Sequence, residues 1–108
     1  MIFVVNKKTH TSQKNDVYIG RGSPLGNIYD FKHSNHPQVK HIVKNREEAI
    51  EKYADYIKNK INKDDAEITN ELAHILHVQE KYKNVNLVCY CAPEKCHGDI
   101  LKQLLEQI

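Results

Sequence analysis

Hydrophobic positions along the chain fall into short continuous runs and into longer stretches with helical periodicity. The short runs, rich in β-branched and other apolar residues, predict strands at 2–5, 16–19 and 85–91. The last run is the clearest strand, and it is broken by Ala92 and Pro93. Because helical stretches stand between the second and third runs, crossover connections and a mainly parallel sheet are expected.

Three stretches have the spacing of amphipathic helices. The first begins at Asn45, a capping residue, with Glu48 three positions later. The second begins near Asp64, where acidic side chains suit the positive end of the helix dipole. The apolar faces are carried by Ile50, Tyr53, Ile57 and Ile61, by Ile68, Leu72, Ile75 and Leu76, and by Ile100, Leu101, Leu104, Leu105 and Ile108.

The order of these elements predicts one α/β domain over residues 1–108. We expect a small three-layer Rossmann-like sandwich whose mainly parallel sheet has three or four strands. Residues 30–44 show no clear period, and they are expected to form a surface excursion.

Composition and charge narrow the class of protein. The chain is 40% hydrophobic and 28% charged, its formal net charge is +2, and Lys and Glu alternate along the predicted helices. A dedicated non-specific nucleic-acid binder would carry a clustered basic face instead. No run of 18 apolar residues suits a membrane span, and the apolar start at 2–5 is too short for a signal peptide. All three cysteines lie within 89–96, which indicates a reducing compartment and predicts a cytoplasmic protein.

A glycine-rich loop follows the second predicted strand, which is where ligands bind in open α/β sheets. Glycines allow a close approach of the backbone, and the Arg21 guanidinium suits a phosphate or a carboxylate. The spacing matches neither a Walker loop nor the dinucleotide fingerprint, and composition alone favours a structural turn. The candidate ligand-binding residues here are Gly20, Arg21, Gly22, Ser23, Gly26 and Asn27.

A second unusual segment, residues 89–99, gathers every cysteine of the chain. Four potential zinc ligands occur in it: Cys89, Cys91, Cys96 and His97. Cys96 and His97 are adjacent, however, which makes simultaneous ligation awkward. Neither a metal nor another cofactor is therefore expected, and burial in the sheet is the favoured explanation for Cys89 and Cys91.

The start of the last helix admits two further interpretations. Cys96 is placed where a helix lowers a thiol pKa, and His97 could act as an acid or a base near neutral pH. Alternatively, the free backbone N–H groups around Gly98 suit a phosphate, with Asp99 orienting His97 or holding a ribose hydroxyl. The candidate catalytic residues are therefore His97, Asp99 and Cys96, and Gly98 joins the ligand-binding set.

These motifs resemble domain-of-unknown-function family 4326, a family of small proteins from bacteria and their phages. The resemblance rests on residues 17–27 (VYIGRGSPLGN), 46–53 (REEAIEKY) and 89–101 (CYCAP, two further residues, then CHGDIL). The family usually continues with Pro-Phe where this chain has Ile28 and Tyr29. The resemblance implies a cytoplasmic, phage-linked α/β domain and makes the polar motif positions functional candidates, but it supplies no reaction.

The expected function is binding of a nucleotide or nucleotide-like phosphorylated ligand, with action on its glycosidic or phosphate bond as the catalytic version. Arg21 would hold the phosphate, and His97 or Asp99 would transfer a proton. Looser analogy with nucleotide-handling Rossmann-like domains supports this at the level of fold only. Two alternatives stay open. One is a non-catalytic phage accessory protein that sequesters a signalling nucleotide or binds a host protein. The other is a zinc-stabilised module that binds nucleic acid.

Overall fold

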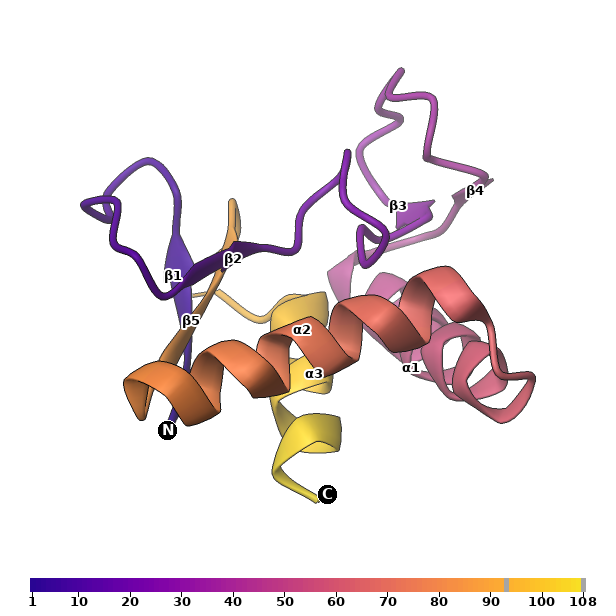
Figure 1. Ribbon diagram of the computed structural model, residues 1–108. Helices are drawn as coiled ribbons and strands as arrows, with labels where there is room; N and C mark the ends of the chain where they lie inside the picture. Colours follow the sequence, from indigo (N-terminus) through magenta and orange to yellow (C-terminus); the bar gives the residue numbers. More distant parts are fainter. Residues whose placement is uncertain (93, 108) are drawn as a thin grey trace.

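Strands and helices follow one another along residues 1–92 and 94–107, the part of the chain that the computed structural model describes (Figure 1). In chain order the elements are β1 (Ile2–Asn6), β2 (Asp16–Tyr18), β3 (Tyr29–Asp30), β4 (His41–Ile42), α1 (Arg46–Asn62), α2 (Ala66–Tyr82), β5 (Val85–Cys89) and α3 (His97–Glu106). Pro93, expected to help end the last strand, and Ile108, expected on the last apolar helical face, lie outside the described residues.

The main sheet has the order β1-β5-β2, and both pairings are parallel. Leu87 stands at its centre, in register with Val4 on one side and Val17 on the other. All five residues of β5 are buried, as expected for a central parallel strand. Helices α1 and α2 form the crossover between β2 and β5, so the predicted α/β class with a parallel sheet of three strands is confirmed.

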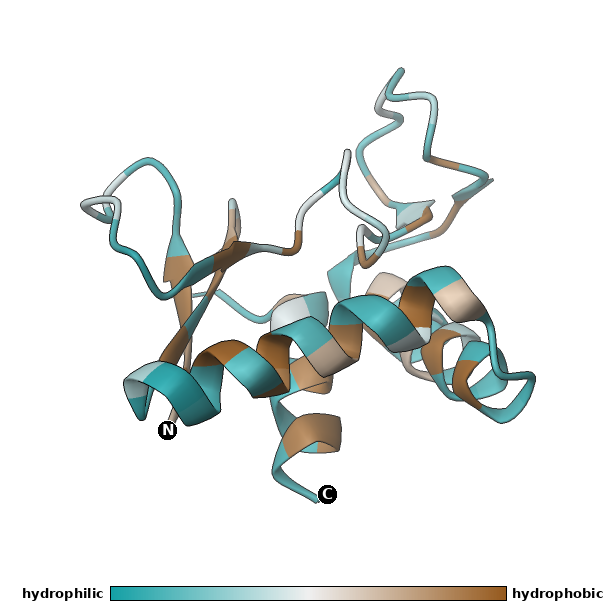
Figure 2. Ribbon diagram, in the orientation of Figure 1, coloured by the Kyte–Doolittle hydropathy of each residue, from teal (hydrophilic) through white to brown (hydrophobic). Residues whose placement is uncertain are grey.

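One face of this sheet holds the hydrophobic core. Successive strand residues point to opposite faces, so Val85, Leu87 and Cys89 share a side. They join a single buried cluster with side chains from all three described helices: Tyr53, Ile57, Ile68, Leu72, Ile75, Val78, Leu101 and Leu105. Figure 2 shows the same division, with hydrophobic strands beside helices that are striped hydrophobic and hydrophilic. The helices therefore pack on one side of the sheet.

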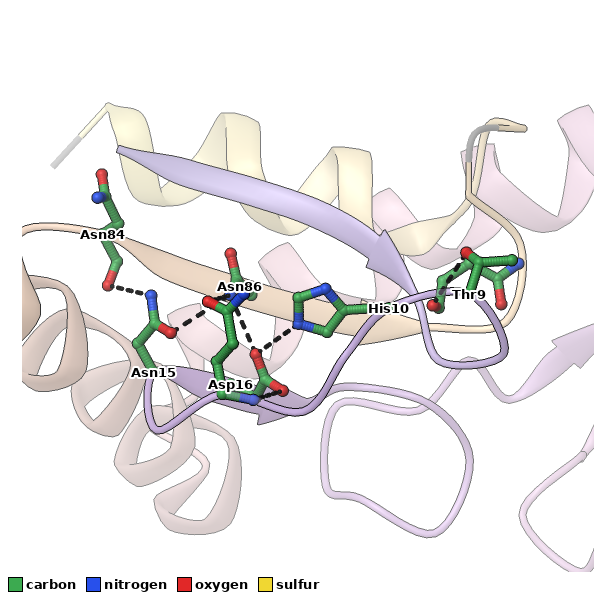
Figure 3. A network of polar contacts seen from close by, with 8 residues as sticks. Thr9, His10, Asn15, Asp16, Asn84 and Asn86 are labelled. Carbon is green, nitrogen blue, oxygen red and sulfur yellow. Dashed lines mark hydrogen bonds and ion pairs between the residues drawn. The ribbon is translucent and has the colours of Figure 1, made fainter.

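The other face carries a polar network and the loop between β1 and β2 (Figure 3). Asn86 of β5 donates from Nδ2 to Asp16 Oδ1 at 3.0 Å and to Gln13 Oε1 at 3.3 Å. His10 donates from Nε2 to the same Asp16 oxygen at 2.9 Å. The connection from β1 to β2 contains no helix among its described residues. This loop, rather than a helical layer, lies on the second face of the expected sandwich.

The helix starts are fixed by side-chain caps. Asn45 Oδ1 accepts from the backbone N–H of Glu48 at 2.9 Å, which confirms the predicted cap of α1. Asp65 caps α2 by accepting from the Ile68 N–H at 3.1 Å, so that helix begins just after the expected position. None of α1, α2 and α3 has the length and hydropathy of a membrane span.

The predicted surface excursion contains regular structure that sequence periodicity missed. β3 and β4 pair in parallel, with Tyr29 opposite His41, and the two rings stack with centroids 5.1 Å apart. Asp30 of β3 is buried, and β3 packs on α1. The excursion is therefore anchored beside the glycine-rich loop.

The Asp16 network predicts a specific loss of stability in acid. Burial raises the pKa of Asp16, but donors from Gln13, Asn86 and His10 outweigh burial and lower it below the ordinary value of 3.8. Such a group stabilises the fold above its unfolded pKa, and this contribution is lost as the pH falls below about 4. We expect Asp16→Asn to lower the unfolding free energy by about 1–2 kcal/mol at pH 7 and by less at pH ~3.

Urea unfolding of both proteins at the two pH values measures this difference. Asp55→Asn, at an exposed position of α1, is the control. An equal destabilisation by Asp16→Asn at both pH values would contradict the assignment.

Candidate functional site

A cleft of about 750 Å³ opens where the three parallel strands end. Its lining includes Asn6 at the end of β1, Tyr18 at the end of β2 and Tyr90 just after β5. Ligands of open α/β sheets bind at such carboxyl edges. Both segments singled out from the sequence reach the cleft, through Gly20, Arg21 and Asn27 and through Cys91, Cys96 and His97.

Arg21 is held in place by the loop that contains it. Its Nε donates to the carbonyl of Asn27 at 2.9 Å, and its Nη2 donates to the carbonyl of Tyr29 at 3.1 Å. Nη2 also lies 3.4 Å from Asp30 Oδ1. Among the described residues Nη1 has no hydrogen-bond partner, so its two N–H groups remain for a ligand.

The buried carboxylate of Asp30 organises the next part of the wall. Burial raises its pKa, but the backbone N–H groups of Ser34 and Lys32 and the Arg21 guanidinium outweigh burial and lower the pKa below its ordinary value. The contact with the Ser34 N–H measures 2.6 Å. Asp30 is therefore ionised at neutral pH, and the chain that wraps around it brings Phe31 and Lys32 to the cleft.

Three of the predicted ligand-binding residues shape the loop instead of lining the cleft. Ser23 donates from Oγ to the carbonyl of Gly20 at 2.8 Å. Gly22 has a φ of +100°, which favours glycine, and its N–H donates to Gln38 Oε1 at 2.7 Å. A Cβ at Gly26 would meet the same Gln38 oxygen at 2.7 Å. These contacts fix the backbone that presents Arg21.

Aromatic rings form another part of the wall. The Tyr18 hydroxyl donates to the carbonyl of Arg21 at 2.7 Å, and its ring lies so close to Gly20 that a Cβ there would clash. The Tyr90 ring meets Tyr18 edge-on at 6.2 Å and is 50% exposed. Asn6 fixes the turn that carries Tyr90, because its Nδ2 donates to the carbonyls of Tyr90 and Ala92 at 3.1 and 2.9 Å.

His97, the first residue of α3, is buried and neutral. Burial, followed by the positive charge of Arg21, lowers its pKa to about 4 against the opposing bond to Ile19. A carbonyl can only accept, so Nε2 donates to the Ile19 oxygen, 2.6 Å away, and Nδ1 is the acceptor of the ring. The imidazole edge also packs on Tyr53, with centroids 5.1 Å apart. At neutral pH the ring can accept a hydrogen bond from a ligand but carries no acidic proton of an imidazolium.

The backbone N–H groups expected to bind a phosphate are largely used within the helix start. The Cys96 N–H donates to Asp99 Oδ2 at 3.0 Å, and the Gly98 N–H donates to Cys96 Sγ at 3.3 Å. Asp99 is exposed and completes this capping box, outside the lining of the cleft. A Cβ at Gly98 would lie 2.9 Å from Val4 Cγ1, so glycine lets α3 approach β1. The polar groups that the cleft offers are therefore mainly those of side chains.

The cysteines divide into a buried pair and a cleft residue. Cys89 and Cys96 are 1% and 3% exposed, and their sulfur atoms lie 3.5 Å apart. β5 ends at Cys89, so Cys91 stands in the following turn, half-buried, and lines the cleft. Within residues 1–92 and 94–107, no group of three or more His, Cys, Asp or Glu side chains is arranged to hold a metal ion.

Sequence reasoning missed Arg46 as a site residue. It is the first residue of α1, and its guanidinium stacks over the Phe31 ring at 5.0 Å. Nη2 pairs with Glu94 at 2.8 Å, and Nη1 donates to the Lys95 carbonyl at 3.4 Å. Arg46 belongs to the stretch 46–53 on which the family resemblance partly rests. That resemblance was the signal that could have identified it as a site residue. Its polar partners, Glu94 and Lys95, lie about fifty positions away, so local spacing could not reveal its role.

Fold and site together define a small parallel α/β domain with a cleft of cationic and aromatic side chains at the carboxyl edge of its sheet. The chain matches the family described as Domain of unknown function (DUF4326) over residues 4–107 and belongs to that family. Comparison with curated proteins and with solved structures found no match. The resemblance inferred from the sequence motifs is thereby confirmed.

The buried imidazole predicts a second pH dependence. Folding lowers the pKa of His97 to about 4, from an unfolded value of about 6.5. The unfolded chain therefore binds more protons between these values, and the unfolding free energy falls as the pH is lowered from about 6.5 to 4. We expect this group to contribute a loss on the order of 3 kcal/mol.

Denaturant unfolding at several pH values tests this expectation, with His97→Gln removing the pH-dependent part over that window. His77→Gln, at an exposed position of α2, is the matched control. If His97→Gln and the parent chain lose stability equally between pH 6.5 and 4, the neutral buried imidazole is ruled out.

Proposed function

We propose that the protein binds a nucleotide or nucleotide-like phosphorylated ligand in the cleft. One observation carries the proposal: Arg21, Arg46 and the Tyr18–Tyr90 wall all line the same cleft at the carboxyl edge of a parallel sheet. Guanidinium groups suit phosphate oxygens, and aromatic surfaces suit bases of any identity.

The charge of the lining favours an anion. Four cationic side chains line the cleft against two acidic ones, an excess of two positive charges before any cysteine ionises: Arg21, Lys32, Arg46 and Lys95 against Asp30 and Glu94. The acidic groups are already paired with the two arginines. The ammonium groups of Lys32 and Lys95 supply the net positive charge, and the N–H groups of the two arginines that are not used in these pairs can still donate to a phosphate.

The neutral polar groups suit the sugar portion of such a ligand. His97 offers Nδ1 as an acceptor for a ribose hydroxyl, because Nε2 is committed to Ile19. In the catalytic version of the proposal, which acts on a glycosidic or phosphate bond, the neutral His97 ring orients the reacting hydroxyl group by accepting a hydrogen bond at Nδ1. Asp99 then acts only by shaping the helix start, since its carboxylate caps α3.

The proposed setting is the cytoplasm, or the host cytoplasm for a phage-encoded protein. All three cysteines are free thiols, which supports a reducing compartment. The phage link comes from the family resemblance. A domain that sequesters a signalling nucleotide would use the same cleft without turnover.

Binding to a panel of nucleoside phosphates and nucleotide sugars tests the proposal. We expect Arg46→Gln to weaken binding of a hit by about tenfold or more, the effect of losing a hydrogen bond to a charged group. Lys58→Gln, at an exposed position of α1 outside the cleft, should leave affinity unchanged. Arg21→Lys is preferable to Arg21→Ala, because it keeps a cation beside buried Asp30.

Thermal shift identifies the hits and calorimetry measures their affinity. Chromatography of the ligand after incubation separates turnover from sequestration. An absence of hits, or equal affinities for the Arg46 and Lys58 variants, would sink the proposal. A fall in melting temperature on chelator addition, without any nucleotide effect, would instead favour the zinc-stabilised alternative.

A second variant separates recognition of the base from recognition of the phosphate. Tyr90→Ala removes a half-exposed ring without opening the core. We expect it to weaken nucleotide binding by about tenfold, in line with the loss of one base–aromatic contact. Binding of pyrophosphate should be unaffected. Equal losses for both ligands would place the base elsewhere.

A further inference from the structure

Three thiols gather where β5 ends and α3 begins. Cys89 closes the strand, Cys96 caps the helix, and their sulfur atoms lie 3.5 Å apart. Cys91 packs against the same buried cluster, yet it is the most exposed of the three and lines the cleft. A reagent that enters the cleft therefore reaches Cys91 first.

The surroundings of Cys91 stabilise a thiolate. The interaction with the Cys96 thiol is the strongest influence, burial opposes it, and the Arg46 guanidinium and Lys32 add further stabilisation, so that the pKa of Cys91 is lowered below its ordinary value. Cys96 retains its proton, and its pKa is raised because it donates to a neighbouring sulfur.

Cys89 also interacts with the Cys96 thiol, and this interaction favours ionisation of Cys89 as well. The Cys96 thiol has a single proton, however, and can donate it to only one sulfur at a time, so Cys89 and Cys91 are not both ionised together. Arg46 and Lys32 line the cleft together with Cys91, and their positive charges favour the Cys91 thiolate. Backbone N–H groups also favour ionisation of Cys89, but Cys89 is 1% exposed and Cys91 is open to the cleft, so the negative charge of the cluster is assigned to Cys91.

We propose that Cys91 is a reactive thiol that hydroperoxides oxidise, and that Cys96 resolves the product as a reversible disulfide. This role is additional to ligand binding and does not depend on it. It uses a nucleophile, two cations and a second thiol that all line the same cleft: Cys91, Arg46, Lys32 and Cys96.

The chemistry balances in two steps. The Cys91 thiolate attacks one oxygen of the hydroperoxide, an S–O bond forms, the O–O bond breaks, and the alkoxide leaves and takes a proton from water. The Cys96 thiol then loses its proton, its sulfur attacks the Cys91 sulfur, and the hydroxide that leaves combines with that proton to form water. Two equivalents of a small thiol reduce the disulfide again and are themselves oxidised to a disulfide.

The first step prepares the second. Cys96 holds its proton because it donates to negatively charged sulfur. Oxidation of Cys91 to a neutral sulfenic acid removes that charge, so the Cys96 proton is released more easily and its sulfur becomes a better nucleophile. Cys89 is 1% exposed inside the sheet, so it is shielded from the oxidant.

Alkylation by iodoacetamide, without any nucleotide present, tests the first part. We expect the Cys89→Ser protein to react at Cys91 about tenfold or more faster than a free thiol at pH 7, with a rate midpoint below the free value of about 8.5. Cys91→Ser should abolish this fast phase, and Arg46→Gln should slow it several-fold. A Cys91 rate equal to that of a free thiol would overturn the proposal.

Hydrogen peroxide followed by peptide mass spectrometry tests the second part. We expect a Cys91–Cys96 linkage in the parent chain and in Cys89→Ser, reversed by glutathione. In Cys96→Ser, a sulfenic acid should accumulate at Cys91 and react with dimedone. A Cys89–Cys96 linkage in the parent chain would show the assignment to be wrong, and this measurement needs no variant to fold.

Discussion

The imidazole of His97 donates from Nε2 to the carbonyl of Ile19, and this 2.6 Å contact joins segments 78 positions apart. Ile19 directly precedes the glycine-rich loop, and His97 directly follows the cap of α3. One buried bond therefore sets the distance between two walls of the cleft. The close approach that it needs depends on Gly98, where a side chain would push α3 away from Val4 of β1. Protonation of the ring would leave a buried positive charge near Arg21, so this arrangement of His97 and Ile19 requires a neutral imidazole.

The two arginines of the cleft are held in place by contacts within the protein itself. Asp30 and two carbonyls fix Arg21, while Glu94, a carbonyl and the Phe31 ring fix Arg46. Rigid donors lose less conformational entropy when a ligand binds, so this pairing favours recognition even though it uses several N–H groups. The glycines of this loop contribute indirectly to the same rigidity, because they allow Tyr18 and Gln38 to pack against the loop backbone.

Sequence periodicity predicted the three strands of the sheet, the three helices and the cap at Asn45, because each of these features depends on residues that are close together in the sequence. It also located the two segments of the cleft. It missed the β3–β4 pair, whose strands of two residues are too short to carry a period. The roles of single motif residues were equally hidden, since Ser23 and Asp99 look like ligand contacts but satisfy nearby backbone groups. Arg46 reaches the cleft only through tertiary packing, which spacing does not encode.

Arg46 links the two proposed roles of the cleft. In these two proposals its guanidinium stabilises the Cys91 thiolate and also donates to the phosphate of a ligand. An anion that engages Arg46 competes with the thiolate for the same N–H groups and adds negative charge beside it, so bound ligand disfavours ionisation of Cys91. Coupling between two equilibria is reciprocal, so protonation of the Cys91 thiolate strengthens anion binding by the factor by which bound anion favours that protonation. Oxidation to a neutral disulfide removes the same negative charge, so it also favours the anion. Ligand occupancy would then protect the thiol from oxidation, and oxidation would retain the ligand.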